Sequence, residues 1–202
     1  MWNLTLINLA LSVIALLLSG LNAYWNFFRK PKLQVIYKDQ EPFRKYLISD
    51  ANPGSPEWYV RIKVINTQKA IAKNCVGRIV EWHTDNRQVE SFDPIKLHWV
   101  SNELDNYAGL DLSYREFDYL DIIVTQRRES KFIIYTNTHL RGIPLLFDAN
   151  ARHLFKVAVY SEKEAFSFSW FLIERDLASE EYRMIAVSQI AENQVEKLLK
   201  CA

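Results

Sequence analysis

The segment Trp58-Tyr-Val-Arg-Ile-Lys-Val-Ile65 points most directly to the fold class of this chain. Apolar side chains occupy every second position, at Trp58, Val60, Ile62 and Val64. Successive side chains of a β-strand point to opposite faces of its sheet, so a period of two predicts a strand with one buried face. The pattern therefore predicts a β-strand over residues 58–65 and favours a fold built from β-strands.

Seven further segments are rich in Val, Ile, Tyr, Phe and Trp, the residues that favour strands. They span residues 33–37, 75–82, 95–100, 119–125, 131–136, 153–160 and 165–173. Polar segments such as 50–56 and 85–87 separate them. Eight short strands over about 140 residues predict a mainly β fold, an immunoglobulin-like two-sheet β-sandwich over residues 33–175.

The last of these segments carries a row of large apolar side chains. Phe166, Phe168, Trp170 and Leu172 share one face, opposite Ser167, Ser169 and Phe171. A row of this kind favours the buried face of a core strand. An exposed ligand platform is the alternative.

The first 28 residues contain no charged side chain, whereas the rest of the 202-residue chain is rich in charge. Residues 4–21 are almost continuously apolar, and a helix over residues 2–25 spans about 35 Å, enough for a bilayer core and its interfaces. Trp2, Tyr24 and Trp25 lie at the two ends, where aromatic rings favour the headgroup level. Residues 1–28 are therefore predicted to form a transmembrane anchor.

A cleaved signal sequence is the competing interpretation of this segment. It calls for small residues after the apolar core, where this chain has Tyr24-Trp-Asn-Phe-Phe28. A retained anchor is therefore favoured.

Basic residues follow the anchor directly. Arg29, Lys30 and Lys32 form a membrane-proximal linker over residues 29–32, and no cation precedes the apolar run. The positive-inside rule then predicts a single-pass protein of the cell (inner) membrane with its β-domain in the cytoplasm. Cys75 and Cys201 suggest no disulfide framework, which agrees with that compartment.

A polar stripe follows the predicted anchor at alternating spacings of three and four residues. It consists of Thr5, Asn8, Ser12, Ala15, Ser19, Asn22 and Asn26. Polar groups in hydrocarbon need partners, so the stripe predicts self-association or pairing with another membrane helix. Hydrogen bonds from Ser and Thr to carbonyls of their own helix are the alternative. A water-lined pore is a more specialised possibility.

The end of the chain carries a helical pattern. Apolar residues recur at helical spacing between Met184 and Leu198, and Ser179 can cap the first turn. Residues 176–202 are therefore predicted to form a short C-terminal amphipathic helix, while residues 182–187 also fit a ninth strand.

Short motifs in the predicted strands resemble an uncharacterised group of prokaryotic proteins. These motifs are Val64-Ile-Asn-Thr67, Ala72-Lys-Asn-Cys75 with Gly77-Arg78, Phe92-Asp-Pro94 with Leu97-His-Trp99, and Leu110-Asp-Leu112 before Tyr119-Leu-Asp121. The resemblance covers about residues 33–173 and implies one N-terminal transmembrane helix before a β-sandwich. That group has no assigned activity, so the resemblance implies an architecture and no chemistry.

Motifs that carry catalysis are absent from the sequence. The histidines His83, His98, His139 and His153 form no metal-binding motif. Glu116, Asp118 and Asp121 cluster without the spacing of a calcium loop, which predicts a solvated start of a strand. We therefore expect no enzyme, no metal and no cofactor, and the net charge of +1 gives no reason to expect a nucleic-acid partner.

These observations together predict a membrane-anchored cytoplasmic β-sandwich that binds or scaffolds a protein partner at the lipid bilayer. The alternative is an oligomerising membrane effector or pore-forming protein whose soluble domain senses a signal. The polar stripe is the feature that supports this alternative.

Overall fold

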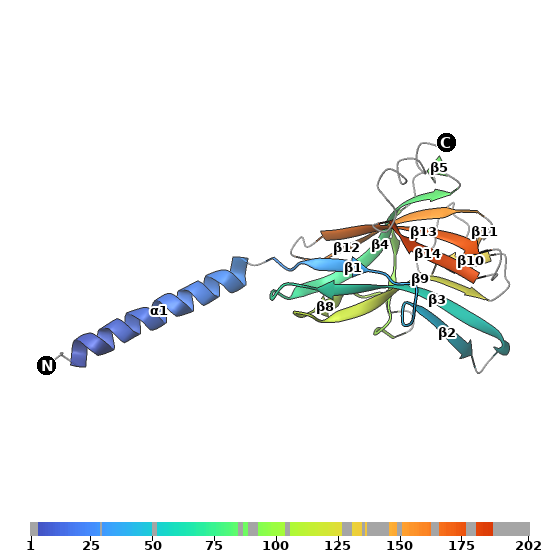
Figure 1. Cartoon of the computed structure of the whole chain (residues 1–202). Coiled ribbons are helices and arrows are strands. Elements are labelled where there is room, and N and C mark those ends of the chain that lie inside the picture. Colours follow the sequence, from blue (N-terminus) through green and yellow to red (C-terminus); the bar gives the residue numbers. More distant parts are fainter. Residues whose placement is uncertain are drawn as a thin grey trace.

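A computed structural model describes residues 4–28, 30–49, 52–84, 87–88, 93–103, 106–126, 131–134, 136, 146–148, 151–162, 166–176 and 181–187. Within these ranges the chain forms one helix, α1 (Leu4–Phe28), and fourteen strands in two antiparallel sheets (Figure 1). The helix projects away from the β-domain, and the sheets pack face to face. This arrangement confirms the predicted two-sheet β-sandwich with an N-terminal helix.

The first sheet is built around the strand that carries the Trp58–Ile65 pattern. Its order is β1 (Leu33–Ile36), β3 (Asn52–Asn66), β9 (Phe117–Gln126), β10 (Lys131–Ile134) and β11 (Leu146–Asp148). In addition, β2 (Arg44–Ser49) pairs with β3, and β7 (His98–Trp99) pairs with β9. The predicted turn over residues 50–56 is shorter than expected, because β3 already begins at Asn52.

The second sheet is built around β4 (Ala72–Thr84) and β12 (His153–Tyr160), which pair along most of their length. Its order is β14 (Glu181–Ala186), β13 (Phe166–Asp176), β12, β4 and β5 (Arg87–Gln88). In addition, β6 (Ile95–Lys96) and β8 (Leu110–Leu112) pair with β4. The predicted strand over residues 95–100 is therefore divided between the sheets, with β6 in the second and β7 in the first.

The hydrophobic core fills the space between the two sheets. Its largest fully buried side chains include Trp82, Phe155, Phe171, Ile62, Ile79, Leu120 and Ile122. Trp99 joins the sheets directly, because its indole Nε1 donates a hydrogen bond to the carbonyl oxygen of Cys75 at 2.9 Å. Gly77 lies where the sheets approach each other closely, since a Cβ at this position would overlap the Leu120 side chain.

The predicted C-terminal helix over residues 176–202 is wrong where the structure describes the chain. Glu181–Ala186 forms the strand β14, which pairs with β13 from Asp176 opposite Glu181 to Phe171 opposite Ala186. Met184 and Ala186 are buried while Arg183 is exposed, the alternation of a strand on a sandwich. The ninth strand is thus confirmed, and Ser179 and residues 188–202 lie outside the described ranges.

Helix α1 has the dimensions of a membrane span. Leu6–Tyr24 has a mean hydropathy of 2.0, and none of it is buried against the β-domain. The helix ends at Phe28, just before Pro31, which disfavours helical backbone at the residue preceding it. The helix is therefore long and apolar enough to cross a bilayer.

Candidate functional site

Of the predicted membrane-interface residues, all but Trp2 lie in the sequence near the point where α1 joins the β-domain. Tyr24, Lys30 and Lys32 are exposed, whereas Trp2, Arg29 and the side chain of Trp25 are not described. The carbonyl oxygen of Lys32 accepts hydrogen bonds from Thr67, from the backbone N at 2.8 Å and from Oγ1 at 3.1 Å. The last residue of the linker, Lys32, is therefore hydrogen-bonded to Thr67, the residue that directly follows β3.

The polar stripe of α1 is exposed over its described members, from Asn8 to Asn22. Ser12 Oγ donates a hydrogen bond to the carbonyl oxygen of Asn8 at 2.9 Å, which supports bonding within the helix at this position. The side chains of Thr5 and Asn26 lie outside the described set. Association through the stripe, and a pore along it, stay predictions.

The second sheet carries a row of aromatic rings on its outer face. Phe166 and Phe168 are each 51% exposed, while Phe171 and Ile173 of the same strand face the core. The prediction that Phe166, Phe168, Trp170 and Leu172 form the core face of this strand is therefore wrong for Phe166 and Phe168. Leu172 is buried and Trp170 is half-buried, but they belong to a small cluster with Leu154 and Val187 and not to the core between the sheets. Alternation shows that two faces of a strand differ, but the packing of the second sheet on the first decides which face is covered.

We name the row formed by Tyr160, Phe166, Phe168 and Trp170 the aromatic surface. Ring centroids are 5.2 Å apart for Tyr160 and Phe166, and 5.5 Å apart for Phe166 and Phe168. Lys156 Nζ lies 5.0 Å from the Phe168 centroid and 5.3 Å from that of Trp170. Aromatic rings and a cation on a rigid strand pair are the features that mark the centre of many protein interfaces.

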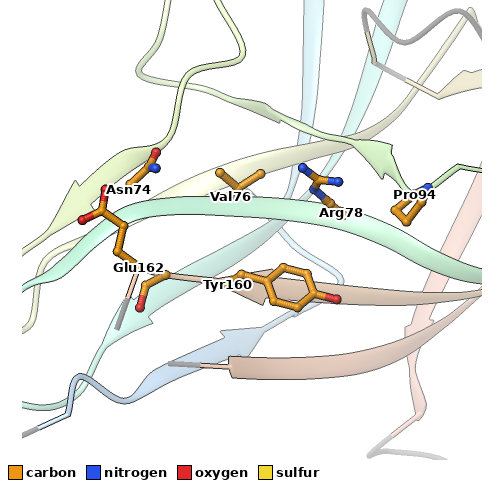
Figure 2. A pocket seen from close by; sticks show the side chains of 7 residues that line it. Asn74, Val76, Arg78, Pro94, Tyr160 and Glu162 are labelled. Atoms are coloured by element: carbon orange, nitrogen blue, oxygen red, sulfur yellow. The ribbon is translucent and has the colours of Figure 1, made fainter. Parts of the chain in front are cut away.

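A pocket of about 420 Å³ adjoins the aromatic surface at Tyr160 (Figure 2). It is lined by Asn74, Val76, Arg78, Pro94, Tyr160, Ser161 and Glu162 from β4, β12 and the segments beside them. The Arg78 guanidinium offers planar donors that suit a carboxylate, and Glu162 offers an acceptor a short distance along the same groove. This pocket could not be predicted from the sequence, because residues 74–78 carry no local pattern that indicates their pairing with β12.

Three ionisable side chains form a buried cluster across β3, β9 and β7. Arg61 Nε donates a hydrogen bond to Asp121 Oδ1 at 2.5 Å, and His98 Nδ1 lies 3.7 Å from Asp121 Oδ2. All three residues are buried. Burial raises the pKa of the Asp121 carboxyl above its ordinary value, and the charges of Arg61 and His98 oppose that rise.

The sequence predicted that Glu116, Asp118 and Asp121 lie together at a solvated start of a strand. For Asp121 this prediction is wrong, and the three carboxylates do not form one site. Glu116 Oε2 accepts a hydrogen bond from the Ser113 backbone N at 2.7 Å, and Asp118 Oδ2 accepts one from Ser101 Oγ at 2.6 Å. Each carboxylate has its own structural partner. Register across β3 and β9, which the local sequence does not encode, brings Asp121 opposite Arg61.

The remaining candidate residues have structural partners of their own. His83 Nε2 lies 3.1 Å from Glu81 Oε1, and His153 Nδ1 accepts a hydrogen bond from Trp82 Nε1 at 3.3 Å. Burial raises the pKa of the Cys75 thiol to about 12, as expected for a small core residue. His139 is not described, and the described part of the chain contains no group of three potential metal ligands.

Two features therefore stand out as functional candidates, an exposed apolar helix fixed to the β-domain and an aromatic surface beside a pocket. No protein-family model, curated protein or solved structure matches this chain, so its function has to be argued from this geometry.

Proposed function

We propose that this chain is a single-pass membrane protein whose β-sandwich is a binding module held at the cytoplasmic surface of the membrane. The observation that carries the proposal is α1, a 25-residue apolar helix that is exposed along its described length and joined to the β-domain by a linker of four residues. Exposed apolar surface of this extent is costly in water. A bilayer removes that cost and needs no further protein.

The basic linker supports the cytoplasmic orientation. Lys30 and Lys32 follow the helix directly, Arg29 adds a third cation, and the segment before the helix has none. Cations of this kind favour the cytoplasmic leaflet.

The aromatic surface is the proposed recognition site for a protein partner. Its rings are held by paired strands, so a partner can bury them at little cost in conformational entropy. Lys156 Nζ lies 3.4 Å from Glu81 Oε2, so its charge is already paired within the domain. Arg78 is the cation at the border that favours a partner with a carboxylate near an apolar patch. The role proposed is binding rather than catalysis, because the cluster of Arg61, His98 and Asp121 is buried and therefore out of reach of a substrate.

The anchor and its orientation are tested together by membrane fractionation and protease protection. In bacterial cells the full chain is expected to resist alkaline carbonate extraction. The β-domain should be digested in inverted vesicles and protected in right-side-out vesicles. Leu17→Arg, which places a charge at the middle of the span at a cost of about 2.5–3.5 kcal/mol, should reduce retention, whereas Leu17→Phe should not. Digestion in right-side-out vesicles would reverse the orientation, and extraction of the wild-type chain would remove the anchor.

The recognition site is tested by photo-cross-linking in intact cells. A benzophenone amino acid at Phe168 is expected to give a discrete cross-linked partner band. The same group at Ile133, another exposed apolar side chain but on the first sheet, should not. Lys156→Glu should weaken the band at Phe168, because it removes the cation beside the rings. Equal bands at both positions would show that the aromatic surface has no special role.

A further inference from the structure

Exposed apolar side chains gather at the end of the β-domain from which α1 leaves. Ile71 precedes β4 and is 47% exposed, Tyr114 lies in the turn between β8 and β9 and is 42% exposed, and Phe117 begins β9 and is 46% exposed. Figure 1 shows α1 joining the β-domain at the end where β8 lies. Three large apolar side chains exposed at one end of a domain are the kind of surface that a membrane can cover.

Hydrogen bonds fix these segments to the linker. The backbone N of Thr67 donates to the carbonyl oxygen of Lys32 at 2.8 Å, and the backbone N of Arg115 donates to the carbonyl oxygen of Asn66 at 2.8 Å. The turn that contains Tyr114 is thus two hydrogen bonds away from the last linker residue. Its position relative to α1 depends on the chain between Phe28 and Lys32 alone.

That connection is too short to admit a protein partner between this end of the domain and the bilayer. Four residues in extended form reach at most about 14 Å. The headgroup layer itself occupies about 5–7 Å on each side of the hydrocarbon core. Little space remains beyond the headgroups, and lipid is the occupant that fits it.

The charges at this end are arranged for contact with lipid phosphates. Lys63 Nζ lies 3.4 Å from the Phe117 ring centroid, and Arg115 Cζ lies 5.0 Å from that of Tyr114, so each exposed ring carries a cation. Lys69 is exposed in the neighbouring connection between β3 and β4.

The nearby carboxylates, in contrast, accept hydrogen bonds from the domain itself. Asp111 Oδ1 accepts one from the backbone N of Asn74 at 2.8 Å, and Glu116 and Asp118 accept those described above. These carboxylates keep their charge but are held toward the domain, whereas Lys69 and Arg115 are exposed and complement the phosphates of anionic lipid.

We propose that this end of the β-domain is a second membrane contact, in which Ile71, Tyr114 and Phe117 enter the headgroup region and Lys69 and Arg115 bind anionic lipid phosphates. Aromatic rings and basic side chains are the combination that binds membrane interfaces. The proposal rests on the membrane anchor proposed above. If this contact forms, the β-domain does not tumble on its linker but keeps a fixed orientation to the membrane. The aromatic surface then faces the space beside the domain, parallel to the membrane plane.

The test is depth-dependent quenching of a fluorophore on the full chain in lipid vesicles. A single cysteine is introduced at Ser113, beside Tyr114, in a Cys201→Ser background, and labelled with an environment-sensitive dye. The buried Cys75, with its raised pKa, reacts slowly, and the background chain measures its contribution. The control label is at Lys45, exposed in β2 opposite Tyr59 and roughly 23 Å along β3 from Asn66.

In vesicles containing anionic lipid, spin-labelled lipid is expected to quench the dye at Ser113 about threefold more than the dye at Lys45. Ile71→Ser combined with Tyr114→Ser should remove most of that difference, while the matched control Ile133→Ser should leave it unchanged. Uncharged vesicles should show a smaller difference.

Two results would overturn the inference and distinguish it from the anchor. If the chain resists carbonate extraction but both labels are quenched equally, the second contact is wrong and the anchor stands. If carbonate releases the chain, both proposals fail together.

Discussion

Replacing Arg61 with methionine is expected to lower the free energy of unfolding by about 3–5 kcal/mol at neutral pH. Arg61 Nε is bonded to Asp121 Oδ1, and both side chains are buried. The variant removes Arg61, which is the closest counter-charge of the Asp121 carboxylate. The nearest remaining ring nitrogen is His98 Nδ1, 3.7 Å from Asp121 Oδ2. Chemical denaturation of the detergent-solubilised chain measures the loss.

The dependence of this loss on pH identifies its cause. The pKa of Asp121 is raised in the folded protein, so the folded state holds its proton more tightly than the unfolded state does. The contribution of this carboxyl to stability is therefore full below its ordinary pKa and is lost as pH rises through the raised value. Without Arg61, whose charge lowers it, the pKa of Asp121 in the folded protein should rise further.

The Arg61→Met loss should consequently shrink as the pH falls from about 8 to about 5, because a neutral carboxyl needs no counter-charge. Arg61→Met combined with Asp121→Asn should recover much of the stability at neutral pH, since it removes both charges. A loss that is constant with pH, or no recovery in the double variant, would mean that packing of the Arg61 stem and not its charge stabilises the domain.

Trp99→Ala is expected to cost about 3–5 kcal/mol, because it opens a cavity between the two sheets. Trp99 is 1% exposed, and its indole is bonded to the Cys75 carbonyl oxygen of the opposite sheet. Trp99→Phe keeps most of the apolar volume but leaves that carbonyl unsatisfied, so it should cost about 1–3 kcal/mol. Denaturant titration of both variants gives the difference.

Phe168→Ala is the matched control for Trp99→Ala. It also truncates an aromatic ring on a strand, but the ring is 51% exposed, so the loss should stay below that of Trp99→Phe. Equal losses for Trp99→Ala and Phe168→Ala would show that Trp99 does not join the sheets as described.

Strands with a clear period of two could be predicted from the sequence, and every one of the eight is present. β3 shows why, because its buried Val60, Ile62 and Val64 alternate with side chains on the opposite face. The missed strands β2, β5, β8 and β11 are short or polar, and they exist because neighbouring strands supply their hydrogen bonds. β14 followed the same rule, since pairing with β13 outweighed the helical pattern over its own residues, Glu181–Ala186.

The functional candidates divide in a similar way. The long apolar helix follows from residues 1–28 because hydropathy is a property of consecutive residues. The aromatic surface, its pocket and the apolar end of the domain do not, because each depends on which strands pair and which face the other sheet covers.

By itself, the sequence determined the strands that have a clear period of two and the position of one long apolar helix before them. These are local properties, set by side-chain periodicity and by uninterrupted apolar length. The tertiary structure alone decided that Phe166 and Phe168 are exposed, that Arg61, Asp121 and His98 are buried together, and that Ile71 and Tyr114 lie beside the linker. Burial and charge pairing arise between segments distant along the chain, so they depend on which strands pair and on how the two sheets pack.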